Sequence, residues 1–216
     1  KTVLDLQREA AEYCKAKNVY RVTGYQAEMV DRKIQERNDL NIQVRTIDNP
    51  FFRETNNLVS LRFGMREIKE GFILINGDNV FDWAILEKLA VSKSNLTAII
   101  SQKSIYDSDD TKLLIHDEHV MKIGKELKPE QTNAEWTGMC NISSDAKHKF
   151  QDIVEEMIKE PNNRNGPHGY LPAFQHFINR HNDMKFQMID PDKWSEIDFQ
   201  MDLEFVRMHL TRFYNP

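Results

Sequence analysis

The chain has 216 residues, of which 40% are hydrophobic and 29% are charged, which suits one globular domain with a substantial core. The formal net charge of −5 lacks the basic footprint of nucleic-acid-binding proteins, so we expect no nucleic-acid partner. The two cysteines have no metal-ligand spacing, and no apolar run approaches the roughly 18 residues of a membrane span, so we expect no zinc site and no membrane insertion, and a cytoplasmic protein.

Helical and strand patterns alternate through the first half of the chain. Apolar residues at helical spacing predict helices over 2–16, 27–37, 58–67 and 82–92. Short apolar or alternating runs predict strands over 19–23, 42–47, 72–75 and 96–100. Such alternation is typical of parallel strands joined by helical crossovers. We therefore expect an α/β fold with a Rossmann-like, mostly parallel sheet flanked by helices.

The pattern changes after residue 100. Two apolar runs flank the polar residues His116–His119, which predicts a β-hairpin whose turn histidines are solvated rather than bound to a metal. The hairpin would form a small substrate lobe on the sheet. The remaining elements predicted are a strand over 137–142, a helix over 147–159, a loop over 161–169 that could close as a lid, a helix over 172–180, a strand over 186–189 and a helix over 202–213.

Two places in the chain carry acidic residues next to predicted strands. Asp78 follows the apolar run 72–75 and Gly77, and ligands of open α/β sheets lie at the carboxyl ends of strands. The alternative is that Asp78 caps the helix starting near Asp82. Farther on, alternation places Glu196 and Asp198 on one face of an extended segment. Two carboxylates meeting in space would suit Mg²⁺, which takes oxygen ligands and keeps room for phosphates and water.

The acids near the carboxyl end have a structural alternative of their own. Asp198 or Asp202 could instead cap the final helix, because aspartate is a favoured residue at helix starts. The polar run Thr55-Asn56-Asn57 before the helix over 58–67 is likewise open to two interpretations. It could be a cap only, or it could also hold an anion or the edge of a nucleobase.

An ordered set of residues resembles the nucleotidyltransferases that have a glycosyltransferase-A type fold. The chain is most similar to the cytidylyltransferases that activate phosphocholine or 2-aminoethylphosphonate, and the sugar-1-phosphate enzymes come second. The match runs over nearly the whole chain. The residues that carry it are Gly24-Tyr25 with Glu28, Asn49-Pro50, Thr55-Asn56-Asn57 with Ser60-Leu61, Asn76-Gly77-Asp78, Lys125, Glu135 with Gly138, and Trp194 with Glu196-Ile197-Asp198.

The resemblance implies a reaction and a set of site residues. A phosphate or phosphonate oxygen of the acceptor would attack the α-phosphorus of a nucleoside triphosphate, with CTP favoured, and pyrophosphate would leave. Asp78 and Asp198 would bind Mg²⁺, and Lys125 would pair with the phosphate of the acceptor. Thr55, Asn56, Ser60 and Gly77 would lie on the nucleotide side. Glu196 would lie on the acceptor side, and Glu135 and Trp136 would face a cationic amine at the far end of the acceptor. The alternative for Trp136 is plain core packing.

The resemblance also divides the chain, taken as one domain over 1–216, into a nucleotide-binding half (1–101) and an acceptor-binding half (102–216). Family members begin with a strand and a glycine-rich loop that holds the triphosphate, and Lys1 falls about where that element ends. We expect either that this element lies upstream of Lys1, which the missing initiator methionine favours, or that the protein lacks it. The second case would favour a non-catalytic binding module of this fold.

Three functions therefore compete. The first is the Mg²⁺-dependent transfer of CMP to a small phosphate or phosphonate acceptor. The second is a sugar-1-phosphate nucleotidyltransferase that makes an NDP-sugar. The third is the non-catalytic module. The oligomeric state is left open, with a homo-oligomer as one alternative.

Overall fold

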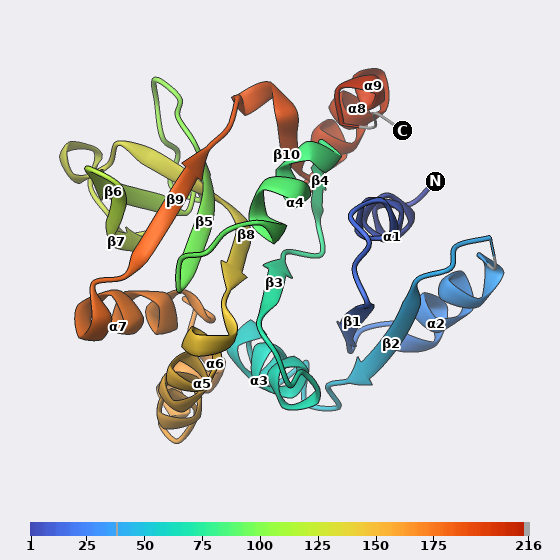
Figure 1. Ribbon diagram of the computed structural model, residues 1–216, viewed down its shortest axis with the longest axis horizontal. Helices are drawn as coiled ribbons and strands as arrows, with labels where there is room; N and C mark the ends of the chain where they lie inside the picture. Colours follow the sequence, from blue (N-terminus) through green and yellow to red (C-terminus); the bar gives the residue numbers. More distant parts are fainter. Residues whose placement is uncertain (38, 214–216) are drawn as a thin grey trace.

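The computed structural model describes residues 1–37 and 39–213 (Figure 1). The helices are α1 (Val3–Tyr13), α2 (Ala27–Glu36), α3 (Asn57–Glu67), α4 (Trp83–Ala90), α5 (Ser144–Ile158), α6 (Pro161–Asn165), α7 (Leu171–His181), α8 (Gln200–Met208) and α9 (Leu210–Phe213), with the 3₁₀ turns η1 (Pro129–Gln131) and η2 (Pro191–Lys193). The strands are β1 (Asn18–Thr23), β2 (Gln43–Asp48), β3 (Phe72–Ile75), β4 (Asn79–Phe81), β5 (Leu96–Ser101), β6 (Lys112–His116), β7 (His119–Gly124), β8 (Ala134–Ile142), β9 (Met184–Met188) and β10 (Trp194–Glu196).

In the described part of the chain, six strands form the main sheet in the order β3-β8-β5-β9-β7-β6, and β6 also pairs with β8. The strands β1 and β2 pair with each other in parallel and form a separate small sheet, at the right of Figure 1. The strands β4 and β10 form an antiparallel pair. The expected α/β class, with a central sheet flanked by helices, is confirmed, and so is the hairpin made by β6 and β7.

The expectation of a mostly parallel sheet needs correction. The long strand β8 lies between β3 and β5 and runs antiparallel to both. β3 and β5 therefore run in the same direction, and β9 is parallel to β5. The alternation of helices and strands in the first half indicated the common direction of β3 and β5. It could not reveal that a strand from the second half would be inserted between them.

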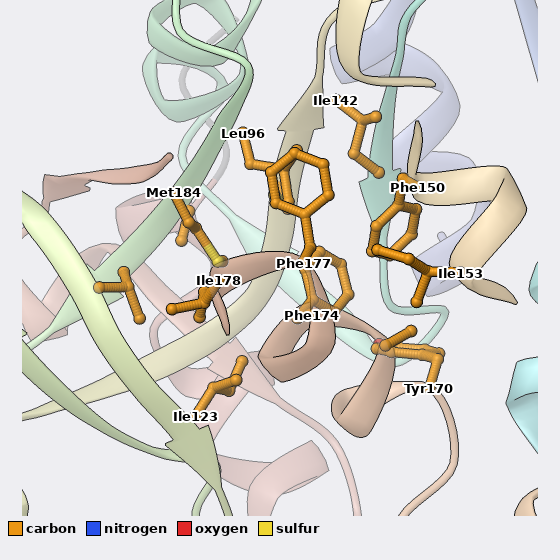
Figure 2. Packing of buried hydrophobic residues seen from close by; sticks show 14 of the residues in the cluster. Leu96, Ile123, Ile142, Phe150, Ile153, Tyr170, Phe174, Phe177, Ile178 and Met184 are labelled. Carbon is orange, nitrogen blue, oxygen red and sulfur yellow. The ribbon is translucent and has the colours of Figure 1, made fainter. Parts of the chain in front are cut away.

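Helices cover both faces of the main sheet, because successive side chains of a strand point to opposite faces. On one face, Ala98 and Ile100 pack in a buried cluster with residues of α3, α5 and α7. Figure 2 shows the aromatic centre of this cluster, where Phe150, Phe174 and Phe177 are almost fully enclosed. On the other face, Ile99 packs in a cluster with residues of α1 and α4. Burying each phenylalanine side chain stabilises the fold by roughly 2–3 kcal/mol.

Polar side chains set where the helices begin. Asn56, Asp82 and Ser143 stand immediately before α3, α4 and α5, and their side chains accept hydrogen bonds from Leu58, Ala84 and Ala146 N–H groups respectively. Such caps satisfy backbone donors that have no partner within the helix. The alternative interpretation of Asp78 as the cap of α4 is therefore wrong, because Asp82 holds that position.

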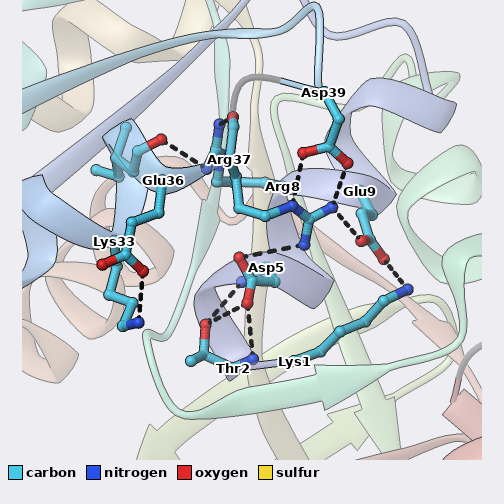
Figure 3. Close-up of polar contacts among 10 residues, drawn as sticks. Lys1, Thr2, Asp5, Arg8, Glu9, Lys33, Glu36, Arg37 and Asp39 are labelled. Atoms are coloured by element: carbon cyan, nitrogen blue, oxygen red, sulfur yellow. Dashed lines mark hydrogen bonds and ion pairs between the residues drawn. The ribbon is translucent and has the colours of Figure 1, made fainter.

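Ion pairs join α1 to the end of α2 (Figure 3). The Arg37 guanidinium contacts Glu9 at 2.8 Å, Asp5 at 3.4 Å and Asp39 at 2.7 Å. Hydrogen bonds to Asp39 and Glu9 raise the pKa of Arg37 further above its usual range. An open hollow of about 520 Å³ lies beside this network, lined by residues of α1 and by Arg37, Asp39, Leu40 and Trp83, and it shares no residue with the acids discussed below.

Three elements differ from the sequence-based expectations. The segments 79–81 and 194–196 were not expected to pair, yet they form the antiparallel strands β4 and β10. The segment 161–169, expected to be a loop, begins with the short helix α6. The final helix is divided into α8 and α9. Strands β4 and β10 and helix α6 are too short to show a periodic pattern. Their contacts with other segments define them.

Candidate active site

The turn that carries Asp78 lies where β3 ends and β4 begins. β10 pairs with β4 so that Glu196 lies opposite Asn79. The Ile197 N–H donates a hydrogen bond to the Asp78 carbonyl at 3.2 Å, which continues this pairing by one step. The chain thus brings Asp78 beside the 196–198 segment, although about 120 residues separate them in sequence. The expected meeting of Asp78 with Asp198 and Glu196 follows from this pairing.

Buried polar contacts fix the backbone of this turn. The Gln7 side-chain amide donates to the carbonyls of Asn76 and Asn79, at 2.9 and 2.8 Å. The Asn79 side chain, which is fully buried, donates to the Thr137 carbonyl at 2.5 Å. The Asn76 N–H donates to the Gly138 carbonyl at 3.1 Å. Because helix α1, strand β8 and the turn are linked in this way, the Asp78 backbone is held from two sides.

Burial and neighbouring charges raise the pKa values of two of these carboxyls, Asp78 and Glu196. Burial raises the pKa of Asp78, and the nearby Asp198 charge raises it further, while its own backbone N–H and Lys125 oppose the shift. Burial, with Asp198 and Asp78, raises the pKa of Glu196 to about 7, and Lys125 again opposes the shift. Negative charge is therefore concentrated here, and the exposed Lys125 ammonium is close enough to act on it. A bound cation would relieve this repulsion.

A magnesium ion would fit this arrangement. The Asp78 Oδ1 atom is buried and has no hydrogen-bond partner among the described residues, an arrangement that costs free energy unless a ligand completes it. In the described part of the chain, no group of three or more His, Cys, Asp or Glu side chains is placed so that it could hold a metal ion. Two carboxylates with open positions are what Mg²⁺ uses when phosphates and water supply the remaining ligands. Asp78 and Asp198 are the pair that would hold it.

Asp202 has the capping role that the sequence left open for it. Its carboxylate accepts hydrogen bonds from the Asp198 and Phe199 N–H groups, at 3.0 and 2.7 Å, at the start of α8. The Asp198 side chain is exposed and is not used as the cap. Asp202 therefore anchors the backbone from which the Asp198 carboxylate projects.

A pocket of about 260 Å³ adjoins the acids. Its lining has aromatic rings and one lysine, but mainly carboxylates. The lining residues are Lys103, Asp109, Asp110, Glu135, Pro191, Trp194, Ser195, Glu196, Asp198, Phe199 and Asp202. A ligand group that enters this pocket meets predominantly negative charge, which favours a cation.

Glu135 forms the buried end of this pocket. One of its oxygens accepts a hydrogen bond from the Ser101 hydroxyl at 2.7 Å, and the other pairs with the Lys103 ammonium at 2.9 Å. Lys103 also pairs with Asp110 at 2.9 Å, and these two partners outweigh burial and raise the pKa of Lys103 above its usual range. The Trp194 indole N–H donates to the same Ser101 hydroxyl at 3.2 Å. The contacts with Ser101 and Lys103 thus fix the orientation of the Glu135 carboxylate.

Trp136 lies in the core and not in the pocket. Its side chain is 4% exposed, its indole N–H donates to the Met139 carbonyl at 2.8 Å, and its ring packs edge-on against Tyr170 and Phe174. Neighbouring residues of a strand point to opposite faces, so Glu135 and Trp136 cannot both face one ligand. The packing alternative describes Trp136, and the aromatic ring that lines the pocket beside Glu135 belongs to Trp194.

The residues expected on the nucleotide side stand around the start of α3. Asn56 caps α3, and its amide also donates to the carbonyls of Asn163 and Gly166, at 2.8 and 2.9 Å. The Ser60 hydroxyl accepts from the buried Asn49 amide at 3.0 Å, and the Thr55 hydroxyl donates to the Phe51 carbonyl at 2.7 Å. Gly77 is exposed beside Asp78. These contacts shape the loop 49–56, and the binding of a nucleotide by it stays a prediction.

Other residues near the site were not singled out from the sequence. Ser101 and Lys103 stand at and after the end of β5 and contact Glu135 because β5 pairs with β8, and Asp110 joins them through its ion pair with Lys103. The buried Lys112 ammonium donates to the Lys125 carbonyl at 2.7 Å and so positions the backbone of Lys125. The sequence signal that could have drawn attention to Lys112 is its place directly before the apolar run 113–115, because a lysine that becomes buried there needs polar partners.

The raised pKa values predict how stability depends on pH in the absence of metal. A carboxyl whose folded pKa lies above its unfolded value keeps its proton in the fold, so the stability it confers is present at low pH and is lost as the pH rises through the folded pKa. For Glu196 this window runs from the usual value of 4.5 to about 7. As the pH rises from 4.5 to about 7, the free energy of unfolding of the Glu196→Gln variant should therefore increase relative to that of the parent. Urea unfolding midpoints in EDTA would measure this, with the exposed Glu130→Gln as control. Identical pH slopes for Glu196→Gln and the parent would contradict it.

Solved structures with the same fold were found, although no protein-family model and no curated protein matches the chain by sequence. The inositol-1-phosphate CTP transferase from T. maritima aligns with a TM-score of 0.77 at 19% identity, over 98% of this chain and 82% of that one. A protein from Bacillus anthracis assigned as a glucose-1-phosphate thymidylyltransferase aligns with a TM-score of 0.79 at 13% identity, over 99% and 84%. The CTP:phosphocholine cytidylyltransferase LicC from Streptococcus pneumoniae aligns with a TM-score of 0.70 at 15% identity, over 97% and 86%.

The chain has the nucleotidyltransferase fold. The alignments cover nearly all of its length, so the fold expected from the resemblance is confirmed for the whole chain and not for one half only. Within this nucleotidyltransferase fold, the described residues contain no helix that is both long enough and apolar enough to cross a bilayer.

Proposed function

We propose that the protein is a Mg²⁺-dependent nucleotidyltransferase that transfers CMP from CTP to a small phosphate or phosphonate acceptor carrying a cationic amine. One observation carries the metal-dependent part of this proposal: the buried, unpartnered Asp78 Oδ1 atom at the end of β3, next to two further carboxylates. The nucleotidyltransferase fold is consistent with it, and the solved structures with this fold include two that are named for the use of CTP.

The reaction forms one bond and breaks one. An oxygen of the acceptor phosphate or phosphonate attacks the α-phosphorus of CTP, the bond between the α-phosphorus and the bridging oxygen breaks, and pyrophosphate leaves with that oxygen. Magnesium held by Asp78 and Asp198 would neutralise charge on the phosphates. Lys125 would attract the acceptor's phosphate and bring it toward the α-phosphorus. Positioning and charge neutralisation suffice for much of the rate enhancement in such chemistry.

The pocket supports an acceptor with a positive charge. The carboxylates of Asp109, Asp110 and Glu135 line it, and so does the ammonium of Lys103. The Trp194 ring lines the same pocket, and an aromatic face attracts ammonium groups as well. Phosphocholine and 2-aminoethylphosphonate both carry an anion and a cation at opposite ends. Their anion would suit Lys125, and their cation would suit the carboxylates of the pocket.

A matrix of substrates tests this function. Pyrophosphate release would be measured with Mg²⁺ while CTP, UTP, ATP and GTP are each combined with phosphocholine, 2-aminoethylphosphonate, glycerol phosphate and hexose 1-phosphates. We expect release with CTP and one of the two amine-bearing acceptors. Release only with a hexose 1-phosphate would replace the proposal by an NDP-sugar synthase. No release with any pair, from a protein that binds neither CTP nor metal, would support the non-catalytic module.

A further inference from the structure

We infer that Tyr170 is a positioning residue that holds the Asp78 turn in place and ties it to the segment on the nucleotide side. This inference rests on the proposed function, since it assigns a role within the same site. Its basis is a hydrogen bond between the hydroxyl of the buried Tyr170 side chain, which donates, and the Oδ1 atom of the half-buried Asn76, which accepts. Asn76 lies two residues before Asp78, so whatever fixes Asn76 restricts where the Asp78 carboxylate can lie.

The Tyr170 side chain has little freedom to move. It is 6% exposed, and its ring packs edge-on against Trp136 and Phe174, with centroid separations of 5.9 Å in each case. Burial and the nearby Asp78 charge raise its pKa above the usual range, so the hydroxyl stays protonated and remains a donor at neutral pH. The ring is thus a rigid support that presents one donor to Asn76.

The backbone polar groups of Asn76 are also engaged. Its N–H donates to the Gly138 carbonyl at 3.1 Å, and its own carbonyl accepts from the Gln7 amide at 2.9 Å. The side-chain oxygen of Asn76 accepts from the Tyr170 hydroxyl. An amide oxygen that is partly shielded from water and loses this donor must find another partner or move. Removing the Tyr170 hydroxyl should therefore loosen the turn without removing any candidate metal ligand.

Tyr170 also belongs to a segment that contacts the residues expected to lie beside the nucleotide. The Tyr170 N–H donates to the Asn57 Oδ1 atom at 2.9 Å. The Asn56 N–H donates to the Arg164 carbonyl at 2.6 Å, and its amide bonds the carbonyls of Asn163 and Gly166. The segment 161–170 therefore bridges the start of α3 and the Asp78 turn. Tyr170 is the residue through which this segment contacts the Asp78 turn, by its hydrogen bond to Asn76.

The decisive variant is Tyr170→Phe, which keeps the ring and removes the donor. Binding of Mn²⁺, a substitute for Mg²⁺ that is visible by electron paramagnetic resonance, would be titrated in the absence of nucleotide. We expect the dissociation constant for Mn²⁺ to rise about three- to tenfold. Without the Tyr170 hydroxyl the turn is less ordered before binding, and part of the binding free energy is used to order it. Hydrogen exchange of residues 76–79 should become faster in the same variant, and kcat for pyrophosphate release should fall more than KM for CTP rises.

The control is Phe177→Leu, which loosens the same aromatic cluster at a ring that packs against Phe150 and not at the rings that support Tyr170. It should lower the thermal midpoint and leave the Mn²⁺ dissociation constant unchanged. A double-variant cycle with Asn76→Ala adds a second test, because the effect of Tyr170→Phe on Mn²⁺ binding should vanish when Asn76 is already truncated. Unchanged Mn²⁺ binding in Tyr170→Phe, or full additivity in the cycle, would overturn the inference.

The failure of this inference can be told apart from the failure of the proposed function. If Asp78→Asn abolishes Mn²⁺ binding while Tyr170→Phe leaves it intact, only the positioning role is lost. If Asp78→Asn also leaves Mn²⁺ binding intact, the metal site itself is not where we propose it.

Discussion

The Asp78→Asn variant should release pyrophosphate at least roughly a thousandfold more slowly than the parent protein at saturating CTP and acceptor, because a metal ion contributes several kcal/mol to the stabilisation of a phosphoryl-transfer transition state. The amide replaces a charged oxygen ligand by a neutral group, so both the affinity for the metal and the neutralisation of phosphate charge decline. Stability should not fall, because the charge removed is one that burial already disfavours. Initial rates across a range of Mg²⁺ concentrations would measure the loss.

The matched control for this variant is Asp145→Asn, which makes the same chemical change at an exposed position in the first turn of α5. It should retain parental rates. If Asp78→Asn turned over as fast as Asp145→Asn, Asp78 would have no part in catalysis. If excess Mg²⁺ restored full turnover to Asp78→Asn, the carboxylate would contribute to affinity alone.

The Gly138→Ala variant should lose about 2–4 kcal/mol of unfolding free energy, the largest stability effect that we expect for so small a change. Gly138 has a φ of +76°, and a Cβ atom there would lie 2.5 Å from the Asn76 Nδ2 atom. The left-handed conformation costs an L-residue about 1–2 kcal/mol, and overpacking costs a similar amount. Because Asn76 would have to move, the variant should also bind Mn²⁺ more weakly. Urea unfolding and the same Mn²⁺ titration would measure both effects.

Gly77→Ala is the comparison for stability. A Cβ atom at Gly77 would lie 3.4 Å from the Arg21 Nη1 atom, which is an ordinary contact, and the φ of Gly77 is not in the left-handed region. Its unfolding free energy should stay within about 0.5 kcal/mol of the parent. Equal losses in the two variants would contradict the explanation of the Gly138→Ala effect by its φ and by the close approach of Asn76.

Much of the fold could be predicted from local pattern. The run 72–75 was predicted with its correct bounds, and the hairpin at 112–124 was recognisable because a polar turn separates two apolar runs. The path of the chain through the sheet was less accessible. Periodicity reveals which residues are buried, but it carries no information on which strand a given strand pairs with. The insertion of β8 between β3 and β5 is a pairing of this kind, and so is that of β4 with β10.

The candidate site was predictable only in part, because local pattern shows where a polar residue follows a strand but not which side chains it meets in space. Asp78 could be proposed because it follows an apolar strand, and ligands of open α/β sheets lie at the carboxyl ends of strands. Asp198 and Glu196 could be proposed from alternation. Trp136 could not be assigned to core or pocket from its residue type, because a tryptophan suits both. Lys103 and Asp110 could be recognised only from the structure, in which Lys103 pairs with both Glu135 and Asp110.

The position of β8 has a consequence for the order in which the protein folds. Residues 72–75 and 96–101 both pair with 134–142, so neither can join the centre of the sheet until the ribosome has released the chain beyond residue 142. During synthesis, β3 and β5 therefore have unpaired strand edges until β8 has been made. Unpaired strand edges can pair with other chains and so promote aggregation. By contrast, β1, α2 and β2 can form a parallel unit within about 30 residues. We expect early compaction of this unit, a slow closing of the main sheet, and a dependence of the folding yield on chaperones and on the rate of synthesis.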